Sequence, residues 1–181
     1  GNTFVTTPGA EQLLFWAYTG PVGSGTTAEP LDIFRYDLAS GVTQRITNDS
    51  TRYRYLETDN TRVAWRRATT TGLGRDLIVA PVADLTAQST FSTSMSVYHL
   101  SDGLLAWIEP NGNGTSVLKV NDGTSTTTIT SVATSAPYVA DGRITFTEYG
   151  QTLVWNSDNT RQVLLNSAPL YTPAHDDGVA F

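Results

Sequence analysis

The sequence predicts an all-β fold, and two observations lead to this prediction. Apolar residues make up 39% of the 181 residues and charged residues only 15%. The difference is made up by Thr, which favours strands, and by Ser, Gly and Asn, which favour turns. Short apolar and β-branched runs are separated by turn residues along the whole chain, and no helical periodicity is found. The length is enough for one domain with a sizeable core.

Composition also excludes several classes of protein. The net charge is −6 and there is no basic stripe, so we do not expect a nucleic-acid partner. Cys is absent, which excludes disulfides and thiolate metal sites, and no cofactor is expected. No apolar run approaches the ~20 residues that a membrane-spanning helix needs. Because the chain begins at Gly1 and not Met, we expect that a signal peptide or an upstream domain has been removed.

A repeat with a period of roughly 40 residues runs through the chain. Each copy has Asp and a turn residue, followed by a short strand that ends on an aromatic residue. The copies are TDNTRVAWRR (58–67), SDGLLAWIE (101–109), ADGRITFTE (140–148) and DDGVAF (176–181), with AEQLLFWAY (10–18) as a degenerate fifth. The aromatic residues at the common position are Trp16, Trp65, Trp107, Phe146 and Phe181.

Each interval of the repeat contains the same further strands in the same order. A strand follows the aromatic residue at 32–38, 76–82, 116–122 and 152–158. After a turn, the next strand is expected at 42–47, 89–94, 126–131 and 162–166. A last strand leads to the next Asp turn at 53–58, 96–101, 137–141 and 170–176.

Four antiparallel strands at this period are typical of a β-propeller blade. We therefore predict a partial β-propeller with about four four-stranded blades and the start of a fifth, all in a single domain. The approximate blades are 1–50, 51–94, 95–134, 135–169 and the incomplete 170–181. The five aromatic residues would act as structural anchors that fill the space between blades. The Asp-Gly pairs would form turns with positive φ, and the ASG segment (39–41) would turn its hairpin in the same way.

The hairpin YDLASGVTQRIT (36–47) and the segments SDGLLAW, ADGRITF and DDGVAF carry a resemblance to a known family. The chain resembles the TolB-like (WD-type, PD40) propeller repeats of bacterial envelope and secreted proteins. In that family a YDL-x-TG-x-x-x-R-L-T hairpin is followed by SPDG-x-x-IAF, and here the Ser-Pro is missing from every copy. The resemblance implies a periplasmic or extracellular protein with a protein or glycan partner. It also implies more blades than the repeats found here, so that further blades of the same chain or another chain would complete the ring, unless the sheets close in some other way.

A few residues are candidates for a ligand-binding face. His99 lies on a predicted innermost strand. His175 stands beside Asp176 and Asp177, a group that suits a metal or a general base, although a simple turn is the alternative. Glu109 and Glu148 each follow their aromatic residue by two positions, and a carboxylate pair suits glycosidase chemistry. The alternative for both glutamates is a solvated strand end, so no catalytic residue is assigned.

The sequence predicts a non-catalytic binding or scaffold module that engages a protein or glycan through propeller loops. The alternative is the propeller portion of a carbohydrate- or peptide-cleaving enzyme. A G-x-S-x-G nucleophile motif is absent, and the glycine-spaced loop at 20–30 contains no Lys, which excludes a phosphate-binding loop.

Overall fold

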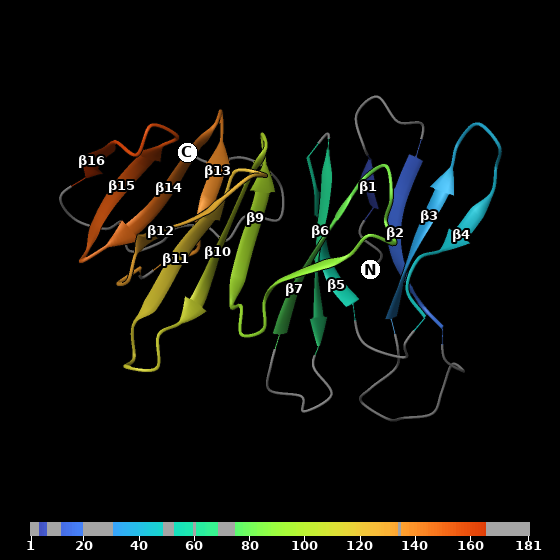
Figure 1. Ribbon diagram of the computed structural model, residues 1–181, viewed down its shortest axis with the longest axis horizontal. Helices are drawn as coiled ribbons and strands as arrows, with labels where there is room; N and C mark the ends of the chain where they lie inside the picture. Colours follow the sequence, from blue (N-terminus) through green and yellow to red (C-terminus); the bar gives the residue numbers. More distant parts are fainter. Residues whose placement is uncertain are drawn as a thin grey trace. The chain divides into compact units, whose positions relative to one another are not determined.

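The computed structural model describes residues 4–6, 12–19, 31–48, 53–59, 61–68, 75–133 and 135–165. Within these ranges the regular structure is entirely β, in four antiparallel sheets of four strands each (Figure 1). The predicted all-β architecture is therefore confirmed. The expected start of a fifth blade, with its aromatic residue Phe181, lies outside the described residues. In these ranges no helix is long and apolar enough to cross a membrane.

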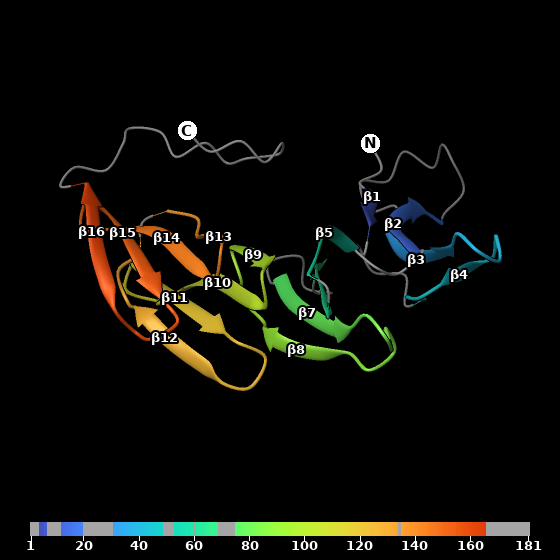
Figure 2. The same cartoon turned by 90° about the horizontal axis from the view of Figure 1, so that it is seen from above.

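In every sheet the strands lie side by side in chain order. Sheet A contains β1 (Phe4–Thr6), β2 (Gln12–Tyr18), β3 (Leu31–Asp37) and β4 (Thr43–Arg45). Sheet B contains β5 (Tyr53–Thr58), β6 (Arg62–Ala68), β7 (Arg75–Pro81) and β8 (Ser89–Ser92). Sheet C contains β9 (Val97–Ser101), β10 (Leu104–Pro110), β11 (Ser116–Asn121) and β12 (Thr126–Thr130). Sheet D contains β13 (Tyr138–Ala140), β14 (Arg143–Glu148), β15 (Gln151–Asn156) and β16 (Arg161–Leu165), and Figure 2 shows these four strands following one another in order.

The chain divides into two compact units, one with sheets A and B (Gly1–Met95) and one with sheets C and D (Ser96–Phe181). In the first unit, one apolar cluster joins the facing sides of sheets A and B. Its buried members are Leu14, Ile33, Tyr53, Leu56, Val63, Trp65, Ile78, Ala80 and Leu85. Trp65 on β6 lies in this cluster and is 0% exposed.

The second unit has its own apolar cluster between sheets C and D. Its largest members are Phe146 on β14 and Trp155 on β15, and Phe146 is only 1% exposed. Side chains of alternate β10 residues, Leu104, Ala106 and Ile108, belong to the same cluster. Since side chains alternate along a strand, the equally buried Trp107 lies on the other face of β10.

Trp16 differs from the other aromatic residues of the repeat. It is only partly buried and packs against the same cluster as Trp65, but from the opposing sheet. The face of β2 away from sheet B instead carries Phe15, whose ring stacks on that of its register partner Phe34 at 5.5 Å between centroids. The position equivalent to Trp65 is therefore Phe15, and the alignment of the degenerate first copy was displaced by one residue.

The two kinds of turn in the repeat differ in their backbone conformation. The Asp102-Gly103 turn has φ values of 49° and 77°, as expected for a two-residue hairpin turn with positive φ at both positions. In the ASG turn only Gly41 has a positive φ, 69°. There the Asp37 carboxylate accepts hydrogen bonds from the backbone N–H and the hydroxyl of Ser40, both at 2.7 Å. The positive φ expected for the ASG turn is therefore present at Gly41, and the Asp37 side chain additionally closes this longer turn.

Candidate functional site

His99 lies on β9, the edge strand of sheet C, and it contacts the neighbouring sheet. Its Nδ1 atom accepts a hydrogen bond from the backbone N–H of Val139 on β13 at 3.2 Å. Its ring lies 5.1 Å from that of Tyr138. Burial lowers the pKa of His99 below the usual 6.5, and the charge of Asp102 opposes this shift. The neutral imidazole therefore acts as an acceptor that joins two sheets.

Asp102 makes a second contact of the same kind. Its Oδ2 accepts a hydrogen bond from the backbone N–H of Asp141 at 2.7 Å. On the edge strand β13 the N–H of Val139 points away from sheet D, and Asp141 lies in the turn between β13 and β14. Side chains of sheet C satisfy both groups, so His99 and Asp102 hold the inner edges of sheets C and D together.

Glu109 is engaged by neighbouring side chains within sheet C. One carboxylate oxygen accepts a hydrogen bond from Nε1 of Trp107 at 2.8 Å, and the other lies 2.6 Å from Nζ of Lys119 on the adjacent strand β11. The carboxylate thus provides the hydrogen-bond acceptor that the buried indole N–H of Trp107 requires. These contacts assign Glu109 a structural role.

Glu148 is engaged between sheets C and D. It accepts a hydrogen bond from the hydroxyl of Thr130 on β12 at 3.0 Å and lies 3.4 Å from Arg161 on β16. Arg161 also donates to the backbone carbonyl of Ile129. Within the described ranges, the structure therefore gives Glu109 and Glu148 separate ion-pair partners.

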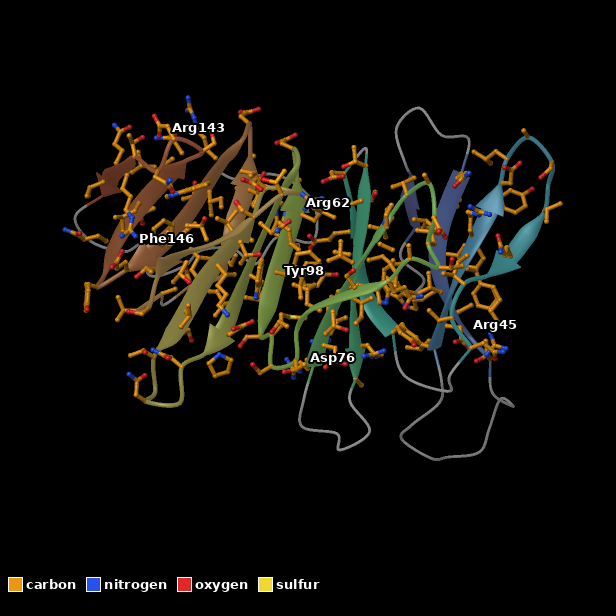
Figure 3. The ribbon with its side chains drawn as sticks, viewed as in Figure 1. Arg45, Arg62, Asp76, Tyr98, Arg143 and Phe146 are labelled. Atoms are coloured by element: carbon orange, nitrogen blue, oxygen red, sulfur yellow. The ribbon has the colours of Figure 1, made fainter. Side chains whose placement is uncertain are left out.

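Sheets A and B also contain ion pairs, which sequence reasoning missed. Asp32 at the start of β3 is 0% exposed and accepts hydrogen bonds from Arg45, Thr19 and Thr47 at 2.5 to 3.0 Å. Asp76, which is labelled in Figure 3, lies near the start of β7, and its carboxylate is 2.6 Å from the guanidinium of Arg67. The signal in the sequence was an Asp at the start of the third strand of each of these sheets.

The described residues contain no group of three or more His, Asp or Glu side chains that could hold a metal ion. Two of the predicted candidates, His175 and Asp176, lie outside the residues that the structure describes.

Five turns share a motif in which Asp or Asn is followed two residues later by Thr. In each turn the Oδ1 atom accepts hydrogen bonds from both the backbone N–H and the hydroxyl of that Thr, at 2.6 to 3.1 Å. The five pairs are Asp59 with Thr61, Asp84 with Thr86, Asn113 with Thr115, Asp122 with Thr124, and Asp158 with Thr160. Such side-chain bonds replace backbone bonds in a turn and fix its conformation.

Most of these turns lie at the same end of their sheets. In a sheet of consecutive antiparallel strands, the first and third turns share one end and the second turn lies at the other. Four of the five motif turns are first or third turns of sheets B, C and D; the exception, Asn113 with Thr115, is the second turn of sheet C. We call the end with the first and third turns of a sheet its capped end; in sheet A it carries the Asp37–Ser40 turn.

Hydrogen bonding at the capped ends keeps the carboxylates ionised. The hydroxyl and then the backbone N–H of Thr86 lower the pKa of Asp84, and those of Thr160 do the same for Asp158. The backbone N–H groups of Ser125 and Thr124 lower the pKa of Asp122 strongly. These three carboxylates are therefore held in fixed turns and stay ionised over a wide pH range.

No protein-family model matches the sequence, and neither does any curated protein sequence. Solved structures do match. The β-propeller domain of the Trilobed protease from Pyrococcus furiosus, described as having an open velcro topology, has a TM-score of 0.62 and 9% identity over 92% of this chain and 58% of that chain. The Pyrococcus horikoshii acylaminoacyl peptidase has a TM-score of 0.58 and 12% identity, over 92% of this chain and 27% of that one. TolB from Acinetobacter baumannii has a TM-score of 0.50 and 12% identity, over 87% of this chain and 41% of that one.

These similarities establish the fold and nothing more, because the identities are low. The chain has a partial β-propeller fold in which sheets A to D are blades. It spans less than two thirds of the length of each of these structures.

Proposed function

We propose that the chain is a non-catalytic binding or scaffold module that engages a protein or glycan through the loops of its blades. The observation that carries this proposal is the set of turns fixed by Asp/Asn-to-Thr hydrogen bonds, which is concentrated at the capped ends. Loops that are rigid before binding lose little conformational entropy when a partner is bound. A binding surface benefits from this arrangement.

The contacts of the candidate acid and base residues support the same proposal. Glu109 and Glu148 each have a cationic partner, and His99 uses Nδ1 to accept a backbone hydrogen bond. Each of these contacts connects strands or sheets, so a contribution to the stability of the blades is enough to explain why these acid and base residues are present. The proposal gives them structural roles and locates recognition in the turns.

A second candidate function is the propeller portion of a peptide- or carbohydrate-cleaving enzyme. It is favoured by the similarity to the propeller domain of the Trilobed protease and to acylaminoacyl peptidase. In this case the chain would accompany a catalytic domain. Purified chain would then cleave neither peptides nor glycans by itself, but it would bind the substrates of its enzyme.

We further propose that the chain belongs to the TolB-like propellers and functions as part of an exported bacterial protein, in the periplasm or outside the cell. The support is the YDLASGVTQRIT hairpin together with the structural similarity to TolB. The single-domain organisation and the blade bounds given above remain part of this proposal. Further blades of the same chain or another chain would complete the ring.

The binding proposal is tested by screening the labelled 181-residue chain against peptide and glycan arrays. A ligand found in this way is then titrated against Thr124→Val and Thr160→Val, which remove the hydroxyls that fix two capped-end turns. We expect each substitution to weaken binding several-fold. Thr127→Val, on the exposed outer strand β12, is the matched control and should leave binding unchanged.

Two results would contradict the proposal. One is a wild-type chain that binds nothing on either array at micromolar concentration. The other is turnover of peptide or glycan by the purified chain, removed by substitution of Glu109 or Glu148, which would make these glutamates catalytic.

A further inference from the structure

Asn113 differs from the residues that open the other four Asp/Asn-to-Thr turns. Those turns begin with a carboxylate, whereas this one begins with an amide. The next residue is Gly114, and both are exposed in the loop that joins β10 and β11. In such a pair the backbone nitrogen of the glycine can attack the side-chain amide, because glycine has no side chain that obstructs the approach.

The turn folds the side chain of Asn113 over the nitrogen that would attack it. Its Oδ1 accepts a hydrogen bond from the N–H of Thr115 at 3.1 Å. This bond makes an Asx turn, in which the Asn side chain takes the place of a backbone carbonyl in a β-turn. The correspondence brings Cγ of Asn113 close to the nitrogen of Gly114. Holding the two reacting atoms together in this way reduces the entropic cost of ring closure.

The same turn supplies two donors to the oxygen on which negative charge develops during the attack. The hydroxyl of Thr115 also donates to Oδ1 of Asn113, at 2.6 Å. Paired donors polarise a carbonyl and stabilise a tetrahedral intermediate, as in the oxyanion hole of an enzyme. Within the described part of the chain, Nδ2 of Asn113 and the N–H of Gly114 make no hydrogen bond, so the leaving group and the nucleophile are both accessible.

A second Asn-Gly pair in the same loop lacks this arrangement. Asn111 precedes Gly112 and is also exposed, but its Nδ2 donates to the hydroxyl of Thr115 at 3.3 Å. The contacts among the described residues give no donor to Oδ1 of Asn111. From the sequence alone the two pairs would react alike, so a difference between their rates measures the contribution of the turn.

The product of the reaction would fit the turn without rearrangement. At Asp84, Asp122 and Asp158 a carboxylate oxygen accepts the same two hydrogen bonds from a Thr two residues ahead. A carboxylate at position 113 would therefore keep both bonds from Thr115 and add one negative charge to an exposed loop. It would also resist further ring closure, because an ionised carboxylate is a poor electrophile.

We propose that Asn113 is a site of self-catalysed deamidation. The nitrogen of Gly114 gives its proton to a solvent base and forms a bond to Cγ of Asn113. The Cγ–Nδ2 bond then breaks, and the nitrogen takes up a proton from water and leaves as ammonia. Water opens the resulting succinimide by breaking one of its two carbonyl C–N bonds, which leaves an aspartate or an isoaspartate at this position. No atom is oxidised or reduced, and water is the co-reactant. The turn lies at the end of sheet C opposite the capped end, so this site goes beyond the proposed function.

The test incubates the full 181-residue chain at mildly alkaline pH and follows each site by peptide mapping with mass spectrometry. In the native chain we expect Asn113 to deamidate at least fivefold faster than Asn111. In urea that unfolds the chain, the two rates should agree within twofold, because both residues precede a glycine. Equal rates at the two sites in the native chain would overturn the inference.

Two variants of Thr115 separate the hydroxyl donor from the remainder of the turn. Thr115→Val removes the hydroxyl and should slow the reaction of Asn113 at least threefold in the native chain. Thr115→Ser keeps both donors and is the matched control, with a rate within twofold of the wild type. In urea neither substitution should change the rate more than twofold. Asn113→Asp, which carries the proposed product, should keep the melting temperature of the wild type.

Several outcomes would contradict the proposal. Faster deamidation in Thr115→Val would mean that the hydrogen bonds protect the amide, and equal rates in Thr115→Val and Thr115→Ser would mean that the hydroxyl takes no part. A native chain that stays intact at Asn113 while the unfolded chain reacts would also overturn it. A lower melting temperature of Asn113→Asp would show that the product does not fit the turn. Each result leaves the array test of the capped ends unaffected, so the two proposals fail separately.

Discussion

Replacement of Phe146 by Ala tests whether sheets C and D are held together by the rings of the repeat. The side chain is 1% exposed and packs among residues of both sheets. Truncation of a buried Phe to Ala generally costs about 3–5 kcal/mol, because transfer energy is lost and a cavity remains. With a total stability of about 5–15 kcal/mol for a domain, this loss is a large fraction of the whole.

The assay is urea unfolding followed by the fluorescence of the buried Trp107 and Trp155 of the same unit. For a urea m-value of about 2 kcal/mol/M, a loss of about 4 kcal/mol lowers the midpoint by roughly 2 M. The matched control is Tyr149→Ala, which removes a comparable ring that is 77% exposed in the next turn. We expect the control to change stability by less than about 0.5 kcal/mol. Equal effects of the two substitutions would refute the reasoning.

Three further substitutions test local features, each by thermal or urea unfolding. Burial lowers the pKa of His99 in the folded chain below 6.5, so as the pH falls the unfolded chain takes up the His99 proton before the folded chain does. The contribution of His99 to stability should therefore be complete above pH 6.5 and decrease as the pH falls below that value. In His99→Gln the stability should depend less on pH. Asp59→Ala removes five hydrogen bonds donated by Thr61 and Arg62, among them those of the Arg62 guanidinium in its ion pair, and should cost at least about 1–2 kcal/mol, whereas a neutral effect would show that the turn does not need this cap. Gly142→Ala places a side chain at a φ of 67° and should cost about 1 kcal/mol; a gain in stability would contradict the turn assignment.

The sequence was sufficient to predict the four sheets, because the repeat combines several independent signals. Asp-Gly turns, alternating strands and an aromatic residue at a common position occur in the same order in sheets C and D. The burial of Trp65 and Phe146 agrees with the predicted pattern. In the first copy, adjacent Phe15 and Trp16 offered two alignments, and only the contacts between sheets A and B distinguish them.

The contacts between sheets were beyond sequence reasoning, since they join residues that are far apart in the chain. The sequence makes His99 a ligand candidate because imidazoles are scarce, yet its partner is the backbone of Val139, 40 residues further along the chain. The register of β5 and β6 shifts at Tyr55 and Leu56. This bulge leaves no local signature in the sequence, because the side chains that fill the core decide a one-residue slip. The Asp/Asn-to-Thr turns, by contrast, have a signal in the sequence, an Asp or Asn two residues before a Thr, which the sequence analysis missed.

The central claim is that the two sheets of each unit pack face to face as blades, and amide hydrogen exchange tests it most directly at β13 and the turn that follows it, where sheet D meets sheet C. Among the described residues, the N–H of Val139 on β13 donates to His99 and the N–H of Asp141 in the following turn donates to Asp102, both from sheet C. NMR-detected exchange should therefore show both amides strongly protected in the native chain, with protection at Asp141 lost in Asp102→Ala. Rapid exchange of both amides under native conditions would mean that the two sheets are not stacked in this way.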